Sequence, residues 1–85
     1  MAKVEIYTTP ICGYCMRAKT LLKRKNVKYE EIDLFKQGYR KEEMMTRSGG
    51  GYTVPQIFIN GKSIGGSDEL HALERAGKLD KLLGG

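Results

Sequence analysis

The sequence has 85 residues, enough for one small domain, which we place over residues 1–85. Hydrophobic residues make up 40% and charged residues 29%, values that are ordinary for a soluble globular protein and exclude a disordered chain. No stretch approaches the roughly 20 apolar residues of a membrane-spanning helix, and the amino terminus lacks the apolar block of a signal peptide. We therefore expect a cytosolic (cytoplasmic) protein that does not associate with membranes.

The net charge of +5 arises from 15 Lys and Arg residues against 10 Asp and Glu residues, and the excess lies mainly at positions 17–28. Such a stretch attracts anions. Nucleic-acid binding also needs base-reading or stacking groups, and no such motif is visible. We expect no nucleic-acid partner; the stretch fits a solvated helix face, or a small acidic ligand as the functional alternative.

The first part of the chain predicts a strand, a helix and a second strand. A short apolar run at 4–7 favours a strand, and Thr8-Thr9-Pro10 ends it. From Gly13 to about Lys25 the apolar residues follow helical spacing. They are Cys15, Ala18, Leu21 and Leu22. The segment 27–34 is rich in strand-forming residues and indicates the second strand.

The middle of the chain predicts a helix followed by a hairpin. Residues 37–48 are charged and rich in helix formers, with Met44 and Met45 as the main apolar residues. Three consecutive glycines then end this helix. The segment 56–64 is typical of a β-hairpin with the two-residue turn Asn60-Gly61.

The last segment predicts a third helix, which Gly65-Gly66-Ser67-Asp68 leads into and Gly77 ends. Its inward positions are Leu70, Leu73 and Ala76, and a short tail holds Leu79, Leu82 and Leu83. A strand–helix–strand unit implies a parallel pair, and the hairpin adds antiparallel strands. The order βαβαββα therefore predicts an α/β fold with a four-stranded mixed sheet flanked by helices.

The two cysteines, Cys12 and Cys15, are the strongest chemical signal. With only His71 to join them they fall short of the four ligands of a structural zinc site, so we expect no metal site of that kind. A C-x-x-C motif at a strand-to-helix junction is typical of redox chemistry, and the alternative is a pair of buried structural thiols. Cys12 lies just before the helix, where free N–H groups and the helix dipole favour an anion. We expect Cys12 to attack disulfides and the more buried Cys15 to resolve them.

Four other features are candidates without a decided role. A proline at the start of a strand, as in Thr53-Val54-Pro55, normally has a trans bond. The run Gly65-Gly66-Ser67-Asp68 suits an anion held by backbone N–H groups, or a tight turn with a helix cap, and Asp68 either caps the helix or receives an ammonium group. Tyr14 either lines a groove or packs at the sheet edge. We expect His71 to face solvent.

Three separated segments together closely resemble the glutaredoxin family, in its dithiol form. They are Cys12-Gly13-Tyr14-Cys15, Thr53-Val54-Pro55 with the strand that follows, and Gly65-Gly66-Ser67-Asp68-Glu69-Leu70. The similarity extends from Lys3 to about Leu83. It implies a thioredoxin-like fold, a cis bond before Pro55, and glutathione as the co-substrate of a disulfide oxidoreductase that acts in electron transport and cell redox homeostasis. The implied substrates are protein disulfides and glutathionylated proteins.

The resemblance also implies roles for individual residues. Cys12 would be the nucleophile that accepts glutathione, and Cys15 the resolving thiol. The implied glutathione-binding residues are Tyr14, Thr53, Val54, Pro55, Gly66, Ser67 and Asp68, of which the last three would hold the γ-glutamyl end. The glycine carboxylate would meet a cation, either Arg40 or Lys41.

The sequence departs from the family pattern at two points near Cys12. Many dithiol members have proline where this chain has Gly13, and many carry a lysine before the first cysteine, where this chain reads Thr8-Thr9-Pro10-Ile11. Glycine at this position also occurs in members that bridge two subunits with a 2Fe–2S cluster held by the first cysteine and glutathione. We therefore expect a monomeric oxidoreductase, with a cluster-bridged dimer, in which Cys12 is the metal ligand, as a second function.

Overall fold

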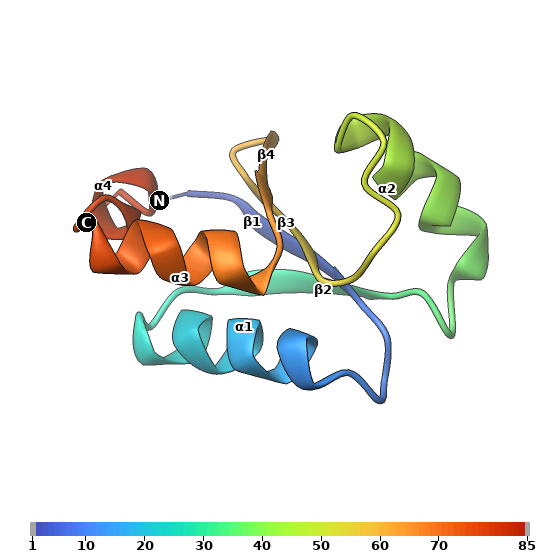
Figure 1. Ribbon diagram of the computed structural model, residues 1–85, viewed down its shortest axis with the longest axis horizontal. Helices are drawn as coiled ribbons and strands as arrows, with labels where there is room; N and C mark the ends of the chain where they lie inside the picture. Colours follow the sequence, from blue (N-terminus) through green and yellow to red (C-terminus); the bar gives the residue numbers. More distant parts are fainter. Residues whose placement is uncertain (1, 85) are drawn as a thin grey trace.

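A computed structural model describes residues 2–84 and contains a four-stranded mixed sheet with helices on both faces (Figure 1). The strands are β1 Val4–Thr8, β2 Tyr29–Asp33, β3 Gln56–Ile59 and β4 Lys62–Gly65. The helices are α1 Gly13–Arg24, α2 Lys41–Arg47, α3 Ser67–Arg75 and α4 Leu79–Leu82, and the 3₁₀ turn η1 Gly38–Arg40 precedes α2. The predicted α/β class and the predicted element order are confirmed.

The order of the strands in the sheet is β2-β1-β3-β4. β1 pairs in parallel with β2 and antiparallel with β3, where Tyr7 lies opposite Gln56. Every residue of β1 and β3 is buried, because helices cover both faces of these central strands. The antiparallel register places the end of β1 beside the start of β3. The loop after β1 and the segment before β3 therefore meet at one edge of the sheet.

Each face of the sheet has its own hydrophobic core. In Figure 1, α1 and α3 lie on the same side of the sheet and α2 lies apart from them. The first core packs α1, α3 and α4 against β1 and β3, and the second packs Met44 of α2 against β1, β2 and β3. Tyr7 and Phe58 of the second core meet edge to face, with ring centroids 5.6 Å apart. Successive side chains of β1 thus point to opposite faces of the sheet: Val4 and Ile6 belong to the first core and Tyr7 to the second.

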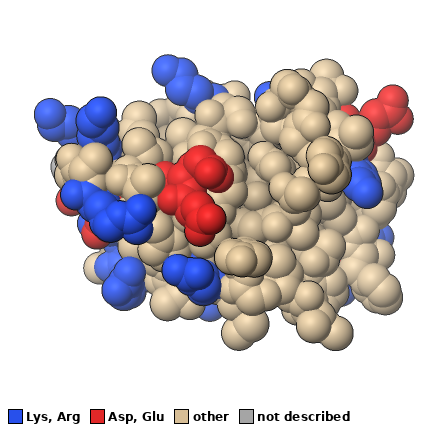
Figure 2. Space-filling view, viewed as in Figure 1, with Lys and Arg blue, Asp and Glu red and all other residues tan. Residues whose placement is uncertain are grey.

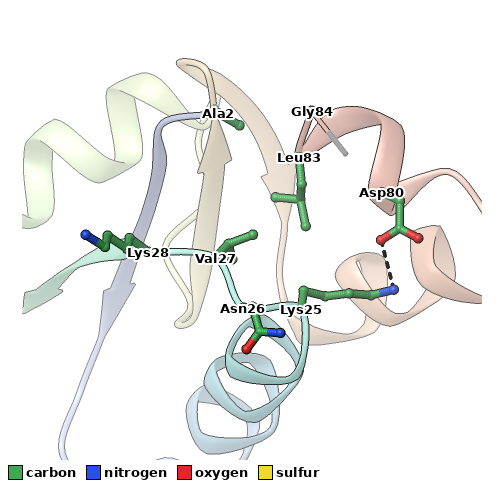
Figure 3. A pocket seen from close by; sticks show the side chains of 8 residues that line it. All are labelled: Ala2, Lys25, Asn26, Val27, Lys28, Asp80, Leu83 and Gly84. Atoms are coloured by element: carbon green, nitrogen blue, oxygen red, sulfur yellow. Dashed lines mark ion pairs between the residues drawn. The ribbon is translucent and has the colours of Figure 1, made fainter.

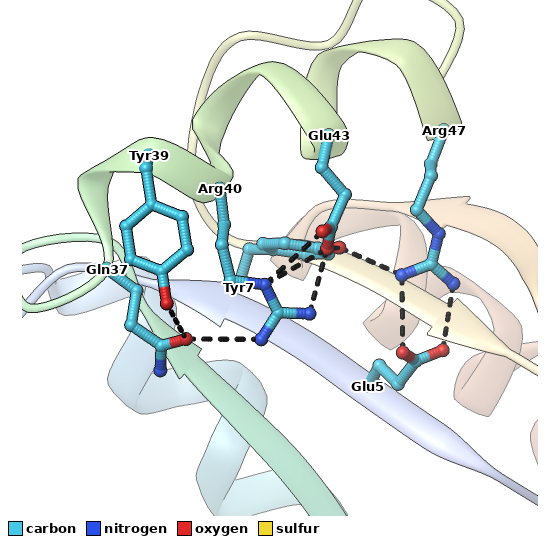
Figure 4. A network of polar contacts seen from close by, with 7 residues as sticks. All are labelled: Glu5, Tyr7, Gln37, Tyr39, Arg40, Glu43 and Arg47. Atoms are coloured by element: carbon cyan, nitrogen blue, oxygen red, sulfur yellow. Dashed lines mark hydrogen bonds and ion pairs between the residues drawn. The ribbon is translucent and has the colours of Figure 1, made fainter.

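Polar contacts hold much of α2 on the sheet (Figure 4). The Arg47 guanidinium donates to both carboxylate oxygens of Glu5, at 2.8 and 3.2 Å, and also to the Tyr7 hydroxyl at 2.9 Å. That hydroxyl donates to Glu43, which pairs with Arg40. The Arg47 side-chain hydrogen bond holds the pKa of Glu5 below its ordinary value. Since Met44 is the only buried residue of α2, these bonds make up much of its attachment to the sheet.

The first and last described residues of the chain lie close together, at the end of the sheet opposite the β1–α1 loop. A cavity of about 510 Å³ lies there, with Ala2, Val27 and Leu83 among its lining residues (Figure 3). Lys25, at the end of α1, pairs with Glu74 of α3 at 2.7 Å and with Asp80 of α4 at 3.0 Å. These ion pairs join three helices far from the loop that carries Cys12.

Three details differ from the predicted elements. The predicted helix 37–48 is a 3₁₀ turn followed by the short helix α2, and only Met44 of its two methionines is buried. Ala76, expected to point inward, is exposed at the C-cap position of α3. The leucine-containing tail forms α4, and its Leu79 is fully buried. Over residues 2–84, the helices are all too short, or too polar, to cross a bilayer.

Candidate active site

Cys12 occupies the N-cap position of α1, at the sheet edge where the loop after β1 meets the segment before β3. Its backbone is extended, and its Sγ accepts a hydrogen bond from the Cys15 N–H at 3.2 Å. The thiol also approaches the Val54 carbonyl oxygen, with an Sγ–O distance of 3.9 Å. A thiolate here would keep the first contact and would lie against the donor end of the helix. This is the predicted position of the attacking sulfur.

Cys15 lies one turn into α1 and is almost completely buried, with 1% of its surface exposed. Burial, reinforced by the side-chain hydrogen bond with Cys12, raises the pKa of the Cys15 thiol to about 12. Both cysteines are free in this structure, and Cys12 is the more exposed of the two. The two sulfurs therefore differ in access, as the sequence predicts: one faces the surface, and the other is a buried thiol beside it.

A groove of about 320 Å³ runs beside Cys12 between the start of α1, the segment before β3 and the start of α3. Its lining residues are Tyr14, Thr53, Val54, Pro55, Gly66, Ser67, Asp68 and Glu69. The structure thus brings together all seven residues that the resemblance implies for glutathione binding, from three distant segments. The bond between Val54 and Pro55 is cis, as the resemblance implies and as the residues alone did not predict.

The start of α3 forms one end of this groove. Gly65 has a φ of +109°, and a Cβ there would lie 2.9 Å from Glu69 Cγ. The Gly66 N–H donates to Glu69 Oε1 at 2.6 Å, so Gly66 takes the N-cap position and the helix begins at Ser67. Asp68 lies in the first turn and does not cap the helix, which leaves its other predicted role, a partner for an ammonium group.

His71 does not face solvent as predicted: it is half-buried, and its Nδ1 lies 2.8 Å from the Ser67 carbonyl oxygen. Because a carbonyl oxygen only accepts hydrogen bonds, Nδ1 must carry the hydrogen in this geometry. The Ser67 hydroxyl, 3.4 Å from the same nitrogen, then keeps its own proton for another acceptor. The four-residue spacing on one helix was the only sequence signal for this contact.

The two candidate cations, Arg40 and Lys41, differ in their surroundings. Arg40 donates to Glu43 at 2.9 Å and to the side chain of Gln37 at 3.3 Å. Lys41 instead lines a second cavity, together with Thr53 and Val54 of the groove. Among the ion pairs of residues 2–84, none involves Lys41. Lys41 is therefore the better placed of the two to meet an anion.

None of the basic residues at 17–28 lines this groove. In Figure 2, Lys and Arg side chains gather over α4 and the ends of α1 and α3, whereas the side with the β1–α1 loop is mainly uncharged. The part of the chain described contains no cluster of three or more His, Cys, Asp or Glu side chains able to hold a metal ion.

Comparison with known proteins gives a consistent result. The family model named Glutaredoxin matches residues 4–64. Glutaredoxin 3 of Escherichia coli K12 is 52% identical over 83 residues, which cover 98% of this chain and 99% of that protein. The crystal structure of a buckwheat glutaredoxin–glutathione complex superposes with a TM-score of 0.88 at 32% identity, covering 96% of this chain and 76% of that one. The solution structure of glutaredoxin from Brucella melitensis gives a TM-score of 0.80 at 52% identity, covering 95% of this chain and 87% of that one.

Proposed function

The chain belongs to the glutaredoxin family of thiol–disulfide oxidoreductases, and on that basis we propose that it reduces protein disulfides and protein–glutathione mixed disulfides with glutathione as electron donor. One observation carries the proposal: the Cys12 sulfur lies 3.9 Å from the carbonyl oxygen of Val54, and Val54 lines a groove together with Tyr14 and the start of α3. The solved buckwheat complex, which contains glutathione on the same fold, supports this choice of co-substrate.

The groove offers a partner for each part of the tripeptide. The backbone of Val54, which lines the groove, can pair with the glutathione cysteine as a strand edge does. The N–H groups of the first turn of α3 have no acceptors within the helix, and with the Ser67 hydroxyl they suit the γ-glutamyl carboxylate. Asp68 suits the ammonium group, and Lys41 suits the glycine carboxylate. The charges at the two ends match those of glutathione.

The proposed reaction proceeds by thiol–disulfide exchange. The Cys12 thiolate attacks the glutathione sulfur of a mixed disulfide, the protein thiolate leaves and takes a proton from solvent, and Cys12 is left bound to glutathione. A second glutathione thiolate attacks the glutathione sulfur of that disulfide, which frees Cys12 and forms oxidised glutathione. In the dithiol route, Cys15 loses its proton and attacks the Cys12 sulfur instead, and glutathione later reduces the resulting Cys12–Cys15 disulfide.

The test compares single cysteine variants in a glutathione-dependent assay with a glutathionylated peptide. Cys12→Ser is expected to show no turnover, because it lacks the nucleophile. Cys15→Ser is expected to retain deglutathionylation, since that route does not use Cys15, and to lose reduction of intramolecular protein disulfides. Normal activity of Cys12→Ser would contradict the assignment. Circular dichroism of both variants serves as the control for folding.

A second candidate function is assembly of a 2Fe–2S cluster between two chains, and Gly13 favours it. A Cβ at Gly13 would have no neighbour within 4 Å, so the start of α1 is open next to Cys12. Each chain offers Cys12 as the more exposed of its two cysteines, and such clusters take four thiolate ligands. Two Cys12 residues and two glutathione thiols would therefore complete the set, and the cluster would supply an electron-transfer or cluster-carrier role.

Anaerobic reconstitution with iron, sulfide and glutathione tests this second function. Visible absorbance with a doubling of mass on a sizing column is the expected result, and Cys12→Ser should abolish both. Gly13→Pro should weaken both, whereas Cys15→Ser should leave them in place. A colourless monomer in the unmodified protein would contradict the proposal, while leaving the oxidoreductase function intact.

A further inference from the structure

A second cavity, which we call the aromatic cleft, adjoins the groove at Thr53 and Val54 and is also lined by Lys41. It has a volume of about 530 Å³. Its other lining residues are Thr9, Pro10, Leu34, Phe35 and Tyr52. Phe35 is 80% exposed and Tyr52 is 71% exposed. Two large exposed aromatic side chains at one cavity are typical of an interaction surface.

Hydrogen bonds fix both loops that carry these aromatic side chains. The Phe35 N–H donates to Asp33 Oδ1 at 2.8 Å, and the Gln37 N–H donates to the Asp33 carbonyl oxygen at 2.8 Å. On the other side, the Gly51 N–H donates to Ser48 Oγ at 2.8 Å, directly before Tyr52. The cleft is therefore preformed, and binding there does not require these loops to be ordered first.

The Thr53 end of the cleft is fixed in the same way. Gln56 Nε2 donates to the Thr53 carbonyl oxygen at 3.0 Å. A Cβ on Gly51 would lie only 2.7 Å from Ser48 Oγ and 2.8 Å from Gln56 Nε2, so the chain is tightly packed at this point. Lys41 supplies a positive charge at the same cavity, while the charge of Arg40 is neutralised by Glu43. The cleft thus combines two apolar walls with one available cation.

We propose that the aromatic cleft binds the residues that follow the reacting cysteine of a polypeptide disulfide, with a large apolar residue next to the cysteine and an acidic residue after it. This inference rests on the function proposed above, which directs the glycine of glutathione toward Lys41. Glycine has no side chain and leaves Phe35 and Tyr52 uncovered. A polypeptide with a large residue at that position buries them, and its acidic residue meets Lys41.

The chemical step is the reduction of a disulfide by the two thiols of the enzyme. The Cys12 thiolate attacks the sulfur of the bound peptide cysteine, and the other peptide thiolate leaves and takes a proton from solvent. Cys15 then loses its proton to solvent and attacks the Cys12 sulfur, which releases the bound peptide as a thiol. Two electrons pass from the Cys12–Cys15 pair to the substrate disulfide.

Symmetric disulfide dimers of short peptides test the proposal with the reduced protein. The reacting cysteine is followed by Phe-Glu in one peptide and by Gly-Lys in the other, and Phe-Lys and Gly-Glu peptides separate the two effects. We expect kcat/KM to be about tenfold higher for the Phe-Glu dimer than for the Gly-Lys dimer, since an aromatic side chain is buried only in the first. Equal values in the unmodified protein would overturn the proposal.

Two variants test which residues cause the preference for the Phe-Glu peptide. The double variant Phe35→Ser with Tyr52→Ser should bring the Phe and Gly peptides within twofold of each other, and should keep the unmodified rate with glutathione and hydroxyethyl disulfide. Lys41→Gln should remove the preference for Glu over Lys but leave the preference for Phe over Gly. A preference that survives the double variant would overturn the proposal.

A binding measurement separates this proposal from the proposed oxidoreductase function. Peptides with Ser in place of Cys, followed by Phe-Glu or Gly-Lys, cannot react and report on the cleft alone. We expect the first to shift NMR resonances of Phe35 and Tyr52 at millimolar concentration, and the second to leave them unchanged. Shifts without disulfide reduction would refute only the oxidoreductase function, whereas disulfide reduction without shifts would refute only the cleft.

Discussion

The asymmetry between Cys12 and Cys15 follows from the position of each residue relative to the first turn of α1. Cys12 caps the helix, and its sulfur accepts a hydrogen bond from the Cys15 N–H. It is the less buried of the two cysteines. Cys15 lies on the inward face of the same helix, and burial raises its pKa to about 12. Only a thiolate attacks disulfides or alkylating agents, so the two residues should differ sharply in reactivity.

Iodoacetamide labelling of the reduced protein measures this difference. At pH 7.5 we expect one alkyl group per chain, located at Cys12 by mass spectrometry of peptides. Because the pKa of Cys15 is raised, its labelling should stay slow well above pH 9, where an exposed cysteine is already ionised. The same reaction in guanidinium chloride should label both residues equally. Equal labelling in the folded protein would contradict the burial argument.

Gly65 is a residue whose backbone conformation shapes the groove. Its φ of +109° disfavours any side chain, and a Cβ there would press on Glu69, which accepts from the Gly66 N–H. Gly65→Ala should lower the free energy of unfolding by about 1–3 kcal/mol. It should also raise KM for glutathione, because the Glu69 side chain must move and its hydrogen bond from the Gly66 N–H at the start of α3 is disturbed. Urea denaturation and steady-state kinetics check the two effects.

Gly38→Ala is the matched control for this substitution. A Cβ at Gly38 would meet nothing within 4 Å, and the residue lies in η1, away from the groove. We expect its free energy of unfolding to stay within about 1 kcal/mol of the unmodified protein, because alanine mainly restricts the unfolded chain there. If both alanine variants behaved alike, the steric argument for Gly65 would be wrong.

Residue roles could be predicted from sequence where they depend on local position, and not where they depend on distant contacts. Cys12 and Cys15 differ because one precedes a helix and the other lies inside it, which the pattern after Pro10 indicates. His71 and Lys41 are different cases, since the Ser67 carbonyl and the cavity beside Thr53 appear only after the chain has folded. The composition of these segments has no feature that ranks Lys41 above Arg40.

At the scale of elements, α2 stands out because so little of it is apolar. Seven residues with one buried methionine give a weak hydrophobic attachment, and the bonds from Arg47 to Glu5 and Tyr7 compensate for it. The Arg47 guanidinium also lies 4.2 Å from the centroid of the Phe58 ring. Since Lys41 belongs to the first turn of α2, this network also determines where the proposed ligand for the glycine carboxylate lies.

Glu5→Gln tests the contribution of this network through its pH dependence. The Arg47 hydrogen bond lowers the pKa of folded Glu5, so the stabilisation is complete above the unfolded pKa of about 4.3 and is lost as the pH falls through the lower folded value. We expect the variant to lose about 1–2 kcal/mol of unfolding free energy at pH 7. The difference between variant and unmodified protein should shrink below pH 4.

Glu30→Gln on the exposed part of β2 provides the control for Glu5→Gln. Its urea denaturation curves should match those of the unmodified protein at pH 7, because exposed charges contribute little. A Glu5→Gln variant whose deficit stayed constant from pH 7 to pH 3 would show that the lost contact is not the ionised pair with Arg47.

The order and type of most elements follow from local patterns, whereas the burial of β1 does not. Its five residues are all buried, including Glu5 and Thr8. These two polar residues are tolerated because Arg47 reaches Glu5, and because Thr8 Oγ1 donates to Glu31 at 2.7 Å. The partners lie 42 and 23 residues along the chain. No window of neighbouring residues contains both members of either pair, so their burial could not be predicted locally.

At the scale of the whole molecule, the candidate site and the junction of α4 occupy opposite ends of the sheet. The site lies at the end of β1 and the start of β3. Leu79, the first residue of α4, belongs to the core that also contains Val4 and Ile59, which pair at the other end of these strands. Leu79 is fully buried although it follows the end of the predicted helix, because α4 folds back onto this core. We therefore expect that a substitution at α4 changes stability and leaves catalysis unchanged.

Leu79→Ala should therefore reduce stability without altering the site. Removing a fully buried leucine side chain should cost about 2–5 kcal/mol, a large part of the stability of a small domain. At temperatures where the variant remains folded, KM for glutathione and kcat should equal those of the unmodified protein, because neither the groove nor Cys12 contacts α4. Leu79→Met keeps the volume and should lose less than about 1.5 kcal/mol. Denaturation curves and kinetics at 15 °C measure both variants, and a raised KM in folded Leu79→Ala would show that the two ends of the sheet are coupled.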